Sequence, residues 1–382
     1  MRVLIAMSGG VDSGVTALLL ARQGYECIGA TMLLAEDVVA TGSLPSAEVL
    51  SADDKDWSIA DPMVPHPLAP VPEPSDVADA RSICRLLGIE HRVIDARHAF
   101  ERRVVAPFVN DYVNGLTPNP CVVCNRLVKF GLLWEVAQEL GCDAIATGHY
   151  ARIERDSQGR PWIVEADDVE KDQSYVLYPV PEEVLEHLVL PLGEAPDKTW
   201  VRTIAEQAGL TSAHKSDSQD ICFVPDGNYT AFVERNTKVG PHKGQILSTD
   251  GTCLGWHMGH ERFTLGQRKG LGVSVGRRVY VVGKDAATNT VYVGDEEQLM
   301  VRRVTVDNAV FAPGCPEASF QGEVVTCYHG ARHKASIVRT GASTFEVRFE
   351  SAVRAPTPGQ SAVVYLGNRV ACGGVMIKTS PC

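Results

Sequence analysis

Residues 2–24 read RVLIAMSGGVDSGVTALLLARQG, and this stretch decides the fold. The apolar run RVLIAM is typical of a buried parallel strand. The turn SGGVDS at 8–13 follows it, and VTALLLARQG then has the pattern of an amphipathic helix ending at Gly24. With YECIGATML at 25–33 as a second strand, the order is strand, turn, helix, strand. This order predicts the start of an α/β fold with a parallel sheet.

The same α/β pattern resumes after an interruption and continues to about residue 205. We expect four or five strand–helix units, forming an N-terminal domain over 1–205. The later helices are predicted at 76–88, near 97–115 and at 125–141, and the later strands at 89–95 and 142–151.

The interruption is a proline-rich, acidic insertion at 38–76. Six prolines fall within 62–74, which excludes a helix or a central strand. Residues 36–79 carry ten acidic side chains and one Lys, a net charge of −9 out of −11 for the whole chain. Residues 301–382, in contrast, carry nine Lys and Arg against five Asp and Glu, a net charge of +4. The overall acidity therefore does not exclude an RNA partner.

The regular alternation of predicted strands and helices ends near residue 205. We expect a small mixed, glycine-rich domain over 206–297 and a third domain over 298–382. Short β-rich runs alternate with turn signals in the last region, which predicts a small antiparallel barrel of six strands. These runs are VRRVTVDNAVF, GEVVTCYH, HKASIVRT, TFEVRFE, QSAVVYL and VACGGVMI.

Composition restricts the class of protein. No apolar run approaches the roughly 20 residues that span a bilayer, and the first residues lack the architecture of a signal peptide. We therefore expect a cytoplasmic protein without a membrane segment. The eleven cysteines are scattered without regular spacing, which favours free thiols over a disulfide framework.

The turn SGGVDS has the properties of a phosphate-binding loop. Its glycines allow the backbone to approach an anion at a helix N-terminus. It lacks the lysine of the GxxxxGK[ST] loop and the spacing of a dinucleotide site. Two glycines followed by Asp12 and Ser13 suit a pyrophosphate, with Asp12 as a magnesium contact. The alternative is an ordinary glycine turn, but the six residues match the PP-loop of ATP pyrophosphatases.

Three cysteines stand out from the rest. Cys121 and Cys124 lie in TPNPCVVCN (117–125), which we interpret as a proline-bounded loop, and Cys222 lies in the polar stretch SDSQDICF. Such a set can bind zinc if a histidine completes it, form a disulfide, ligate an iron–sulfur cluster or carry sulfur. Only sulfur chemistry needs cysteines beside a carbonyl that ATP has activated.

Seven motifs occur in order along nearly the whole chain, and together they resemble the bacterial tRNA-specific 2-thiouridylases. They are SGGVDS, NPCVVCNRLVKF, ATGHYAR, KDQSYVL, SQDICF, LGQRKGLG and TPGQSAVVY. The resemblance implies ATP-dependent conversion of the wobble uridine of the tRNAs for Lys, Glu and Gln to 2-thiouridine. It also implies adenylation of the 2-carbonyl oxygen, with magnesium, followed by attack of sulfur.

The resemblance assigns roles by motif. Asp12 would serve adenylation, Cys124 would be the nucleophile, and Cys222 would carry a persulfide, with a disulfide between these two cysteines after sulfur leaves. ATP would be bound by Ala6, Met7, Ser8, Gly9, Gly10, Val11, Asp12 and Ser13, with Met32 and Gly148 lining the nucleotide. The tRNA would contact Asn119, Pro120, Cys121, His149, Lys171, Asp172, Gln173, Cys327, Tyr328 and Gln360. The basic residues Arg262, Arg268 and Lys269 would suit the RNA backbone.

Three departures from the family pattern change these expectations. Cys121 replaces an Asp found in some members, so Cys121, Cys124 and Cys222 could hold a [4Fe–4S] cluster that replaces the persulfide route. Cys327 stands where many members have an Arg beside the Tyr, so Arg332 and Lys334 become substitutes. The insertion is longer than usual, and we expect it to point away from the RNA or to be disordered.

Other functions remain open from the residues alone. A PP-loop synthetase or amidotransferase would use ammonia and would not need the cysteines. An RNA-binding module would not need SGGVDS, and a metal-storage or redox protein would leave the phosphate loop unused. For the thiolation function we expect a monomer that takes sulfur from a donor or sulfur-relay protein.

Overall fold

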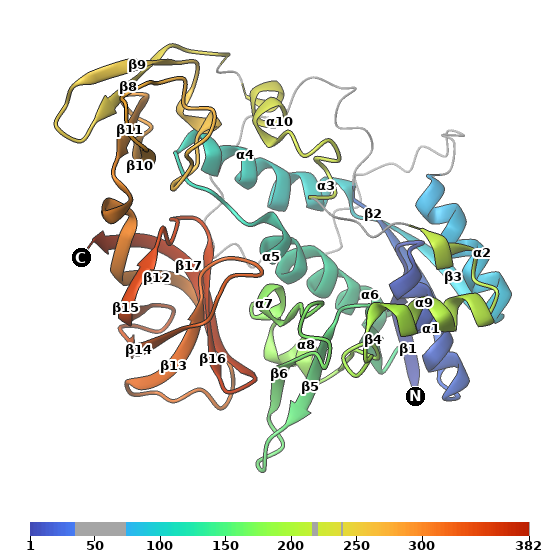
Figure 1. Ribbon diagram of the computed structural model, residues 1–382. Helices are drawn as coiled ribbons and strands as arrows, with labels where there is room; N and C mark the ends of the chain where they lie inside the picture. The colour runs from blue at the N-terminus through green and yellow to red at the C-terminus, as the bar shows by residue number, and fades with distance from the viewer. Residues whose placement is uncertain (35–73, 216–220, 238–239, 382) are drawn as a thin grey trace.

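The computed structural model describes residues 1–34, 74–215, 221–237 and 240–381. The insertion predicted at 38–76 therefore lies almost entirely outside the described residues. Figure 1 shows the part built on a parallel sheet at the right, a small mixed sheet at the upper left and a barrel at the lower left. This arrangement confirms the predicted fold class.

The parallel sheet places its first strand at its centre. All of its neighbouring strands pair in parallel, in the order β3 (Glu90–Asp95), β2 (Glu26–Leu33), β1 (Arg2–Ala6), β4 (Ala144–Ala146) and β7 (Leu188–Val189). Side chains of a strand alternate between its two faces. Val3 and Ile5 accordingly enter one core and Leu4 enters another, and all three are fully buried.

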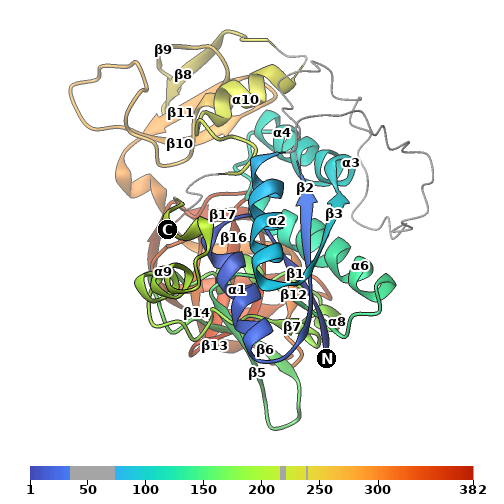
Figure 2. The same cartoon turned by 90° about the vertical axis from the view of Figure 1, so that its right-hand side faces the viewer.

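Helices cover both faces of this sheet. The Val3 face packs against α1 (Val11–Arg22), α2 (Ser75–Leu87), α9 (Lys198–Gln207) and the short η3 (Thr211–His214). Figure 2 shows α1 and α2 side by side. The Leu4 face packs against η2 (Asn125–Leu132), α6 (Leu133–Glu139), α7 (Ser174–Leu177) and α8 (Glu182–Leu185).

Two local predictions need correction. The pair Cys121 and Cys124 lies in a helix, α5 (Pro120–Cys124), which continues into η2, so the predicted loop is wrong here. Proline suits the first position of a helix because its missing N–H has no partner there. The strand predicted at 142–151 is also shorter than expected. Only β4 forms, and β5 (Ala151–Arg155) then starts a hairpin with β6 (Pro161–Glu165) that joins the barrel strands.

A second layer of helices leads to the mixed sheet. The chain runs without a break through α3 (Arg97–Phe100), η1 (Glu101–Val105) and α4 (Ala106–Val113). α10 (Tyr229–Asn236) packs on α4, where the rings of Tyr112 and Tyr229 stack with centroids 5.2 Å apart. The mixed sheet has the order β10 (Tyr280–Asp285), β11 (Thr290–Gly294), β8 (Gly244–Ser248), β9 (Cys253–His257). The turn η4 (His260–Arg262) follows β9.

The C-terminal strands form a closed antiparallel barrel, as predicted. After η5 (Glu296–Leu299), the order is β12 (Met300–Phe311), β15 (Phe345–Arg354), β14 (His333–Arg339), β13 (Phe320–Val325), β16 (Ser361–Leu366), β17 (Arg369–Pro381), and β17 pairs with β12 to close it. Tyr175 of α7 donates a hydrogen bond to the Ser361 carbonyl at 2.9 Å, which ties the barrel to the parallel-sheet part. Within the described ranges, no helix is long and apolar enough to span a membrane.

Candidate active site

The phosphate loop forms a tight turn between β1 and α1. Gly9 has φ of +69°, and a Cβ there would lie 2.5 Å from the Asp76 carbonyl oxygen, so only glycine fits. Ser13 stabilises the turn because its hydroxyl accepts from the Ser8 N–H at 3.2 Å and donates to the Gly10 carbonyl at 3.1 Å. The helix N-terminus behind the turn suits a phosphate. The loop thus fits the pyrophosphate-binding role that its sequence predicts.

The other predicted nucleotide residues surround this loop. Gly148 follows β4, and a Cβ on it would lie 2.9–3.0 Å from atoms of Asp12 and Ser13. Met7 continues β1 through a backbone hydrogen bond to Ala30 at 2.8 Å, and Met32 is half-buried near the end of β2. The structure therefore brings Ala6 to Ser13, Met32 and Gly148 to the carboxyl ends of adjacent strands, where ligands of open α/β sheets bind.

Asp12 is held by two residues that the sequence analysis did not identify. Lys198, at the start of α9, places its ammonium 2.7 Å from both carboxylate oxygens of Asp12. The Tyr150 hydroxyl donates to the Asp12 Oδ1 at 2.7 Å. The side chain of Lys198 is only 14% exposed, so its charge is partly shielded from water. A cation beside the phosphate loop gives the site electrostatic attraction for phosphate oxygens as well as an orientation for Asp12.

The cysteines of α5 lie on one face of the helix start, because residues three apart are neighbours on a helix. Cys121 is exposed and Cys124 is buried, and both are free thiols. Asn119 precedes the helix with extended backbone, and Pro120 is buried. The helix therefore presents one accessible and one buried thiol at the same place.

Cys222 is held near α5 because the next residue, Phe223, packs in an aromatic core. The ring of Phe223 packs edge-on against Phe100 at 5.5 Å and Phe108 at 5.2 Å, and contacts Phe232 at 5.2 Å. Cys124 belongs to the same core. The Cys222 thiol itself is free and exposed, so it lies at the surface above a fixed anchor.

The three thiols influence one another electrostatically. The pKa of Cys124 is raised to about 12, mainly by burial; the thiols of Cys222 and Cys121 contribute to the rise, and Lys129 opposes it. Desolvation also raises the pKa of Cys121 and of Cys222, and Lys129 again opposes the shift. A neighbouring thiol thus disfavours the thiolate form of Cys124 and of Cys222 in addition to desolvation, while Lys129 opposes the shift at all three cysteines.

The cysteines do not form a site for a single metal ion. Across the described ranges, the one set of three His, Cys, Asp or Glu side chains with ligand atoms all within 4.8 Å of one another is His242, His260 and Glu261. In a zinc site the sulfur ligands must all lie on one ion. An iron–sulfur cluster instead binds each cysteine to a different iron, which allows wider separations. Among the described residues, the three thiols therefore do not converge on a single ion in this structure.

The barrel contributes to the cysteine site through Gln360. Its amide nitrogen donates to the carbonyls of Thr117 at 2.9 Å and Pro118 at 3.3 Å. Gly359 lies directly against Thr117, since a Cβ on it would be 2.8 Å from the Thr117 nitrogen. Gln360, predicted to contact tRNA, is thus positioned in the structure as a support for the segment that leads into α5.

The predicted tRNA residues of the hairpin region lie beside the site, several with protein partners. His149 is hydrogen-bonded through Nδ1 to the Thr147 hydroxyl at 2.8 Å, and burial and Lys129 lower its pKa to about 3, so it is a neutral imidazole. The Gln173 side chain accepts from the Tyr150 N–H at 3.0 Å.

Asp172 and Lys171 precede Gln173 in the chain. The Asp172 carboxylate accepts from the Ser174 hydroxyl at 2.6 Å and from the Ala166 N–H at 2.9 Å, and burial raises its pKa. Lys171 is half-buried, and its N–H bonds the Asp168 carbonyl at 3.1 Å. Asp172 therefore caps backbone within the protein, next to the face on which Tyr328 lies.

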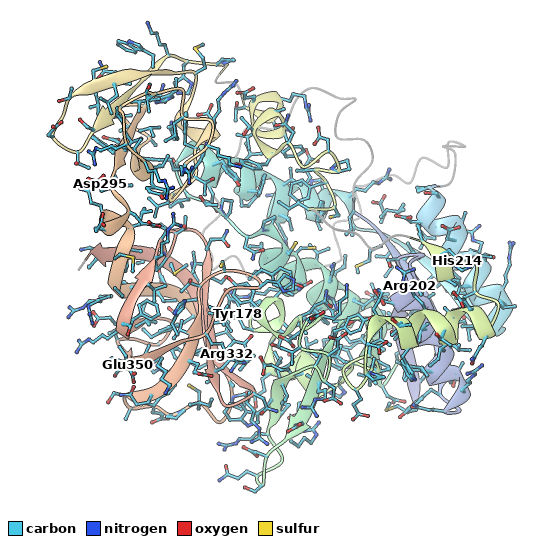
Figure 3. All side chains as sticks on the ribbon, viewed as in Figure 1. Tyr178, Arg202, His214, Asp295, Arg332 and Glu350 are labelled. Carbon is cyan, nitrogen blue, oxygen red and sulfur yellow. The ribbon has the colours of Figure 1, made fainter. Side chains whose placement is uncertain are left out.

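Tyr328 of the barrel comes close to the same place. Its ring lies 6.0 Å from that of Tyr175, and it interacts with Gln173 and with the Cys121 thiol. Cys327 beside it is exposed. The proposed substitute Arg332 has protein partners instead: it forms ion pairs with Glu165 and Glu323 and bonds the Gly367 carbonyl at 2.7 Å. Figure 3 shows Arg332 between the barrel and the β5–β6 hairpin.

The residues that sequence reasoning missed share one property. Lys198 and Lys129 are single polar residues in helices, Tyr150 lies between β4 and β5, and only the fold brings them to the site. Tyr150 stands within the quoted motif ATGHYAR and Lys129 within NPCVVCNRLVKF, so both could have been found there. Lys198 carries no local signal.

The parallel sheet and its phosphate loop define a PP-loop ATP pyrophosphatase-type protein. Family models match along the chain: a tRNA methyl transferase HUP domain at residues 1–226, a tRNA methyl transferase PRC-barrel domain at 231–295 and an aminomethyltransferase beta-barrel domain at 301–377. Three curated relatives are each named tRNA-specific 2-thiouridylase MnmA. That of Syntrophotalea carbinolica is 40% identical over 97% of this chain and 97% of its own.

The other two relatives have similar coverage. The protein of Clostridioides difficile is 37% identical, with 99% of this chain and 98% of its own length covered. That of Sorangium cellulosum is 41% identical, with 98% and 91% covered. The chain belongs to the family of tRNA-specific 2-thiouridylases, which confirms the resemblance seen in the seven motifs.

Proposed function

We propose that this protein is an ATP-dependent tRNA-uridine 2-sulfurtransferase that thiolates the wobble uridine of the tRNAs for Lys, Glu and Gln. One observation carries the proposal. Lys129 acts electrostatically on all three thiols and on His149, and Gly148 beside His149 lies against the phosphate loop. The ATP site and the sulfur site are therefore joined by a short path through the protein.

The chemistry has two steps. The uridine 2-carbonyl oxygen attacks the α-phosphorus of ATP, and pyrophosphate leaves with its charge met by Lys198 and the backbone of the phosphate loop. Magnesium, when bound, would neutralise further charge on the phosphates. Sulfur then forms a bond to C2, and the C–O bond breaks to release AMP. Asp12, oriented by Lys198 and Tyr150, is placed to contact magnesium during the first step.

The relatives are named for the thiolation of uridine, whereas the matching domains are named for the transfer of a methyl or aminomethyl group. Transfer of a methyl group would not need a pyrophosphate-binding loop and would leave three neighbouring cysteines unused. Attack of sulfur on an adenylated carbonyl uses both features. The site chemistry therefore supports thiolation.

The test is a reconstituted reaction with unmodified tRNA, ATP, magnesium and a sulfur source, followed by nucleoside mass spectrometry. Asp12→Asn should abolish pyrophosphate release while retaining tRNA binding. Cys124→Ser should abolish 2-thiouridine while retaining pyrophosphate release that depends on tRNA. Pyrophosphate release with a small acceptor and ammonia, without tRNA, would instead identify a synthetase or amidotransferase.

For the sulfur route, we favour ligation of a [4Fe–4S] cluster by Cys121, Cys124 and Cys222. The Cys121 thiol raises the pKa of both Cys124 and Cys222, so it lies close to both, and this supports a three-cysteine site over a two-cysteine persulfide relay. When bound, the cluster would supply inorganic sulfide as the nucleophile. Protein prepared without oxygen should contain about four iron and four sulfide per chain.

The variants Cys121→Ala and Cys121→Asp separate the two routes. Loss of iron and of thiolation together would support the cluster. Absence of iron in the native protein, with thiolation from a persulfide donor that survives Cys121→Asp, would instead support Cys222 as persulfide carrier. In that route the Cys124 thiolate attacks the Cys222 sulfur, forms a disulfide and frees the outer sulfur, and an external thiol must reduce the disulfide.

The remaining proposals concern organisation. We divide the chain into a PP-loop domain at 1–205, a central domain at 206–297 and a barrel domain at 298–382. We propose a cytoplasmic monomer, because its tRNA substrate is cytoplasmic, that receives sulfur from a donor or relay protein. We also propose that the tRNA binds the ten residues that the family resemblance assigns to it. They are Asn119, Pro120, Cys121, His149, Lys171, Asp172, Gln173, Cys327, Tyr328 and Gln360.

A further inference from the structure

A group of metal-ligating side chains lies away from both the phosphate loop and the cysteines. It consists of His242, before β8, and of His260 and Glu261 in η4, whose ligand atoms lie within 4.8 Å of one another. His260 is 3% exposed and Glu261 is 6% exposed. None of the seven sequence motifs includes these residues, and the thiolation chemistry does not use them.

The hydrogen bonds of His260 fix where its lone pair lies. Its Nε2 is 3.0 Å from the backbone carbonyl of Val113, at the end of α4. A carbonyl only accepts, so Nε2 carries the hydrogen and Nδ1 carries a lone pair in the neutral ring. A histidine that binds a metal through one nitrogen commonly donates its other N–H to a backbone carbonyl in this way.

Asn289 shows that this lone pair has no donor partner. The Asn289 Oδ1 accepts from the His260 backbone N–H at 3.0 Å, and its Nδ2 donates to the His242 carbonyl at 3.0 Å, so the amide cannot be reversed. Oδ1 then lies 3.2 Å from the His260 Nδ1. An acceptor oxygen faces a lone-pair nitrogen in a buried place, which is unfavourable unless a cation lies between them.

Two further acceptors converge on the same place. The Glu261 Oε2 lies 3.7 Å from the His260 Nδ1. His242 uses its Nδ1 toward the Gly240 carbonyl at 3.2 Å, which leaves the lone pair of Nε2 available.

We propose that His242, His260 and Glu261 bind one zinc ion, with Asn289 as a neighbouring oxygen ligand. Two imidazoles and a carboxylate form a donor set that zinc accepts. The 3.7 Å between the His260 Nδ1 and the Glu261 Oε2 is near the about 3.4 Å expected for ligands roughly 2.0–2.1 Å from a tetrahedral ion. His257 is not a ligand, because its Nδ1 accepts from the Gly259 N–H at 3.1 Å and its other nitrogen holds the hydrogen.

The position of the ion suggests a structural role. His260 already bonds the last residue of α4, and the chain continues from there to the cysteine helix. Figure 1 shows α4 beside the mixed sheet that carries η4. A zinc ion here would fix the mixed sheet to the helix layer and would steady the segment that leads to Cys121. This proposal is independent of the thiolation function.

The test is metal analysis of the full-length protein after loading with zinc and dialysis against metal-free buffer. The native protein and Cys121→Ala should retain about one zinc per chain. His242→Ala and Glu261→Gln should retain less than about a tenth of that amount, because each loses a ligand atom. Because His242 is half-buried, its truncation should leave the fold intact, and circular dichroism would check this.

His214→Ala is the matched control. His214 also lies 3.7 Å from a carboxylate, that of Glu206, but this pair is exposed, and no third ligand joins it among the residues that the structure describes. Figure 3 shows His214 at the opposite side of the molecule from the mixed sheet. Its loss should not change zinc content.

Two results would overturn the proposal. One is a native protein that retains no zinc; the other is zinc that is lost in Cys121→Ala but kept in His242→Ala. As a second readout, chelation should lower the unfolding temperature of the native protein by several degrees and leave that of His242→Ala unchanged. Cobalt substitution should give a tetrahedral spectrum without thiolate charge-transfer bands.

Discussion

At the residue scale, the site depends on where single charges lie. Asp12 has a carboxylate 2.7 Å from the Lys198 ammonium and from the Tyr150 hydroxyl, so its orientation is fixed before any ligand binds. Such preorganisation is worth most where water is scarce. Lys129 has a similar role on the sulfur side, where it opposes the raised pKa values of all three thiols.

Removing the Lys198 charge tests this arrangement. Lys198→Met should lower kcat/KM for tRNA-dependent pyrophosphate release by about 10²-fold or more, because it removes a cation from the phosphate site and leaves Asp12 unpaired. Lys198→Arg keeps the charge and should recover part of the rate. Equal rates for Lys198→Met and the native enzyme would show that the lysine only supports the fold.

The Cys124 thiol offers a test by pH. Burial disfavours the thiolate and raises the pKa to about 12, so the thiol should stay protonated at pH 7 to 10 in the metal-free protein. The ultraviolet thiolate absorbance of the native protein minus that of Cys124→Ser should be flat below about pH 10 and rise above it. A step at or below pH 9 would contradict the assignment, and iron or an electrophile should shift the step downward.

At the scale of elements, the sulfur site is an assembly of segments that do not adjoin in the sequence. α5 carries two thiols, the segment after 220 carries the third, and the loop before β16 supports the start of α5 through Thr117. The βα units, the closed barrel and the phosphate loop were all predicted from sequence, because hydrophobic period and glycine turns are local signals.

The sequence could not predict the helical state of Cys121 and Cys124 or the Asp12–Lys198 pair. CVVC has no local helix signal strong enough to outweigh the flanking prolines, although one of them begins the helix. Lys198 contacts Asp12 only because the start of α9 packs beside the start of α1. The two residues are 186 positions apart in the sequence. Contacts of this kind depend on tertiary packing, which a pattern of residues does not encode locally.

The aromatic anchor of Cys222 can be tested as an element. Phe223→Ala should destabilise the protein by about 2–4 kcal/mol, since it removes a ring packed against Phe100, Phe108 and Phe232. Thiolation should fall more strongly than pyrophosphate release, because the Cys222 backbone loses its support. Phe223→Leu should cost less in both measurements. A variant that loses both activities equally at a temperature where it is folded would contradict the anchoring role.

At the scale of the whole molecule, charge is distributed unevenly. The acidic residues concentrate in 36–79, at a net −9, while 301–382 has a net +4. An RNA substrate would bind the less acidic surfaces, and its affinity should fall with salt because the release of counterions from the RNA gains less free energy at a higher salt concentration.

The basic turn between β9 and β10 tests this expectation. Arg268 and Lys269 are exposed there, whereas Arg262 is paired with Glu234. Arg268→Ala combined with Lys269→Ala should weaken tRNA binding and reduce the slope of log affinity against log salt by about 1–2. Arg262→Ala is the control and should change the slope less. An unchanged slope in the double variant would remove this turn from the RNA surface.

The hydrogen bonds from Gln360 to the carbonyls of Thr117 and Pro118 can form only late in biosynthesis. A ribosome makes the cysteine helix more than two hundred residues before it makes Gln360, and the strand that closes the barrel comes later still. The nascent chain therefore exposes Cys121 and Cys124 for most of its synthesis without the support that positions them. Sulfur chemistry begins only when translation is nearly complete, so a truncated product would keep its ATP loop and yet be unable to modify tRNA.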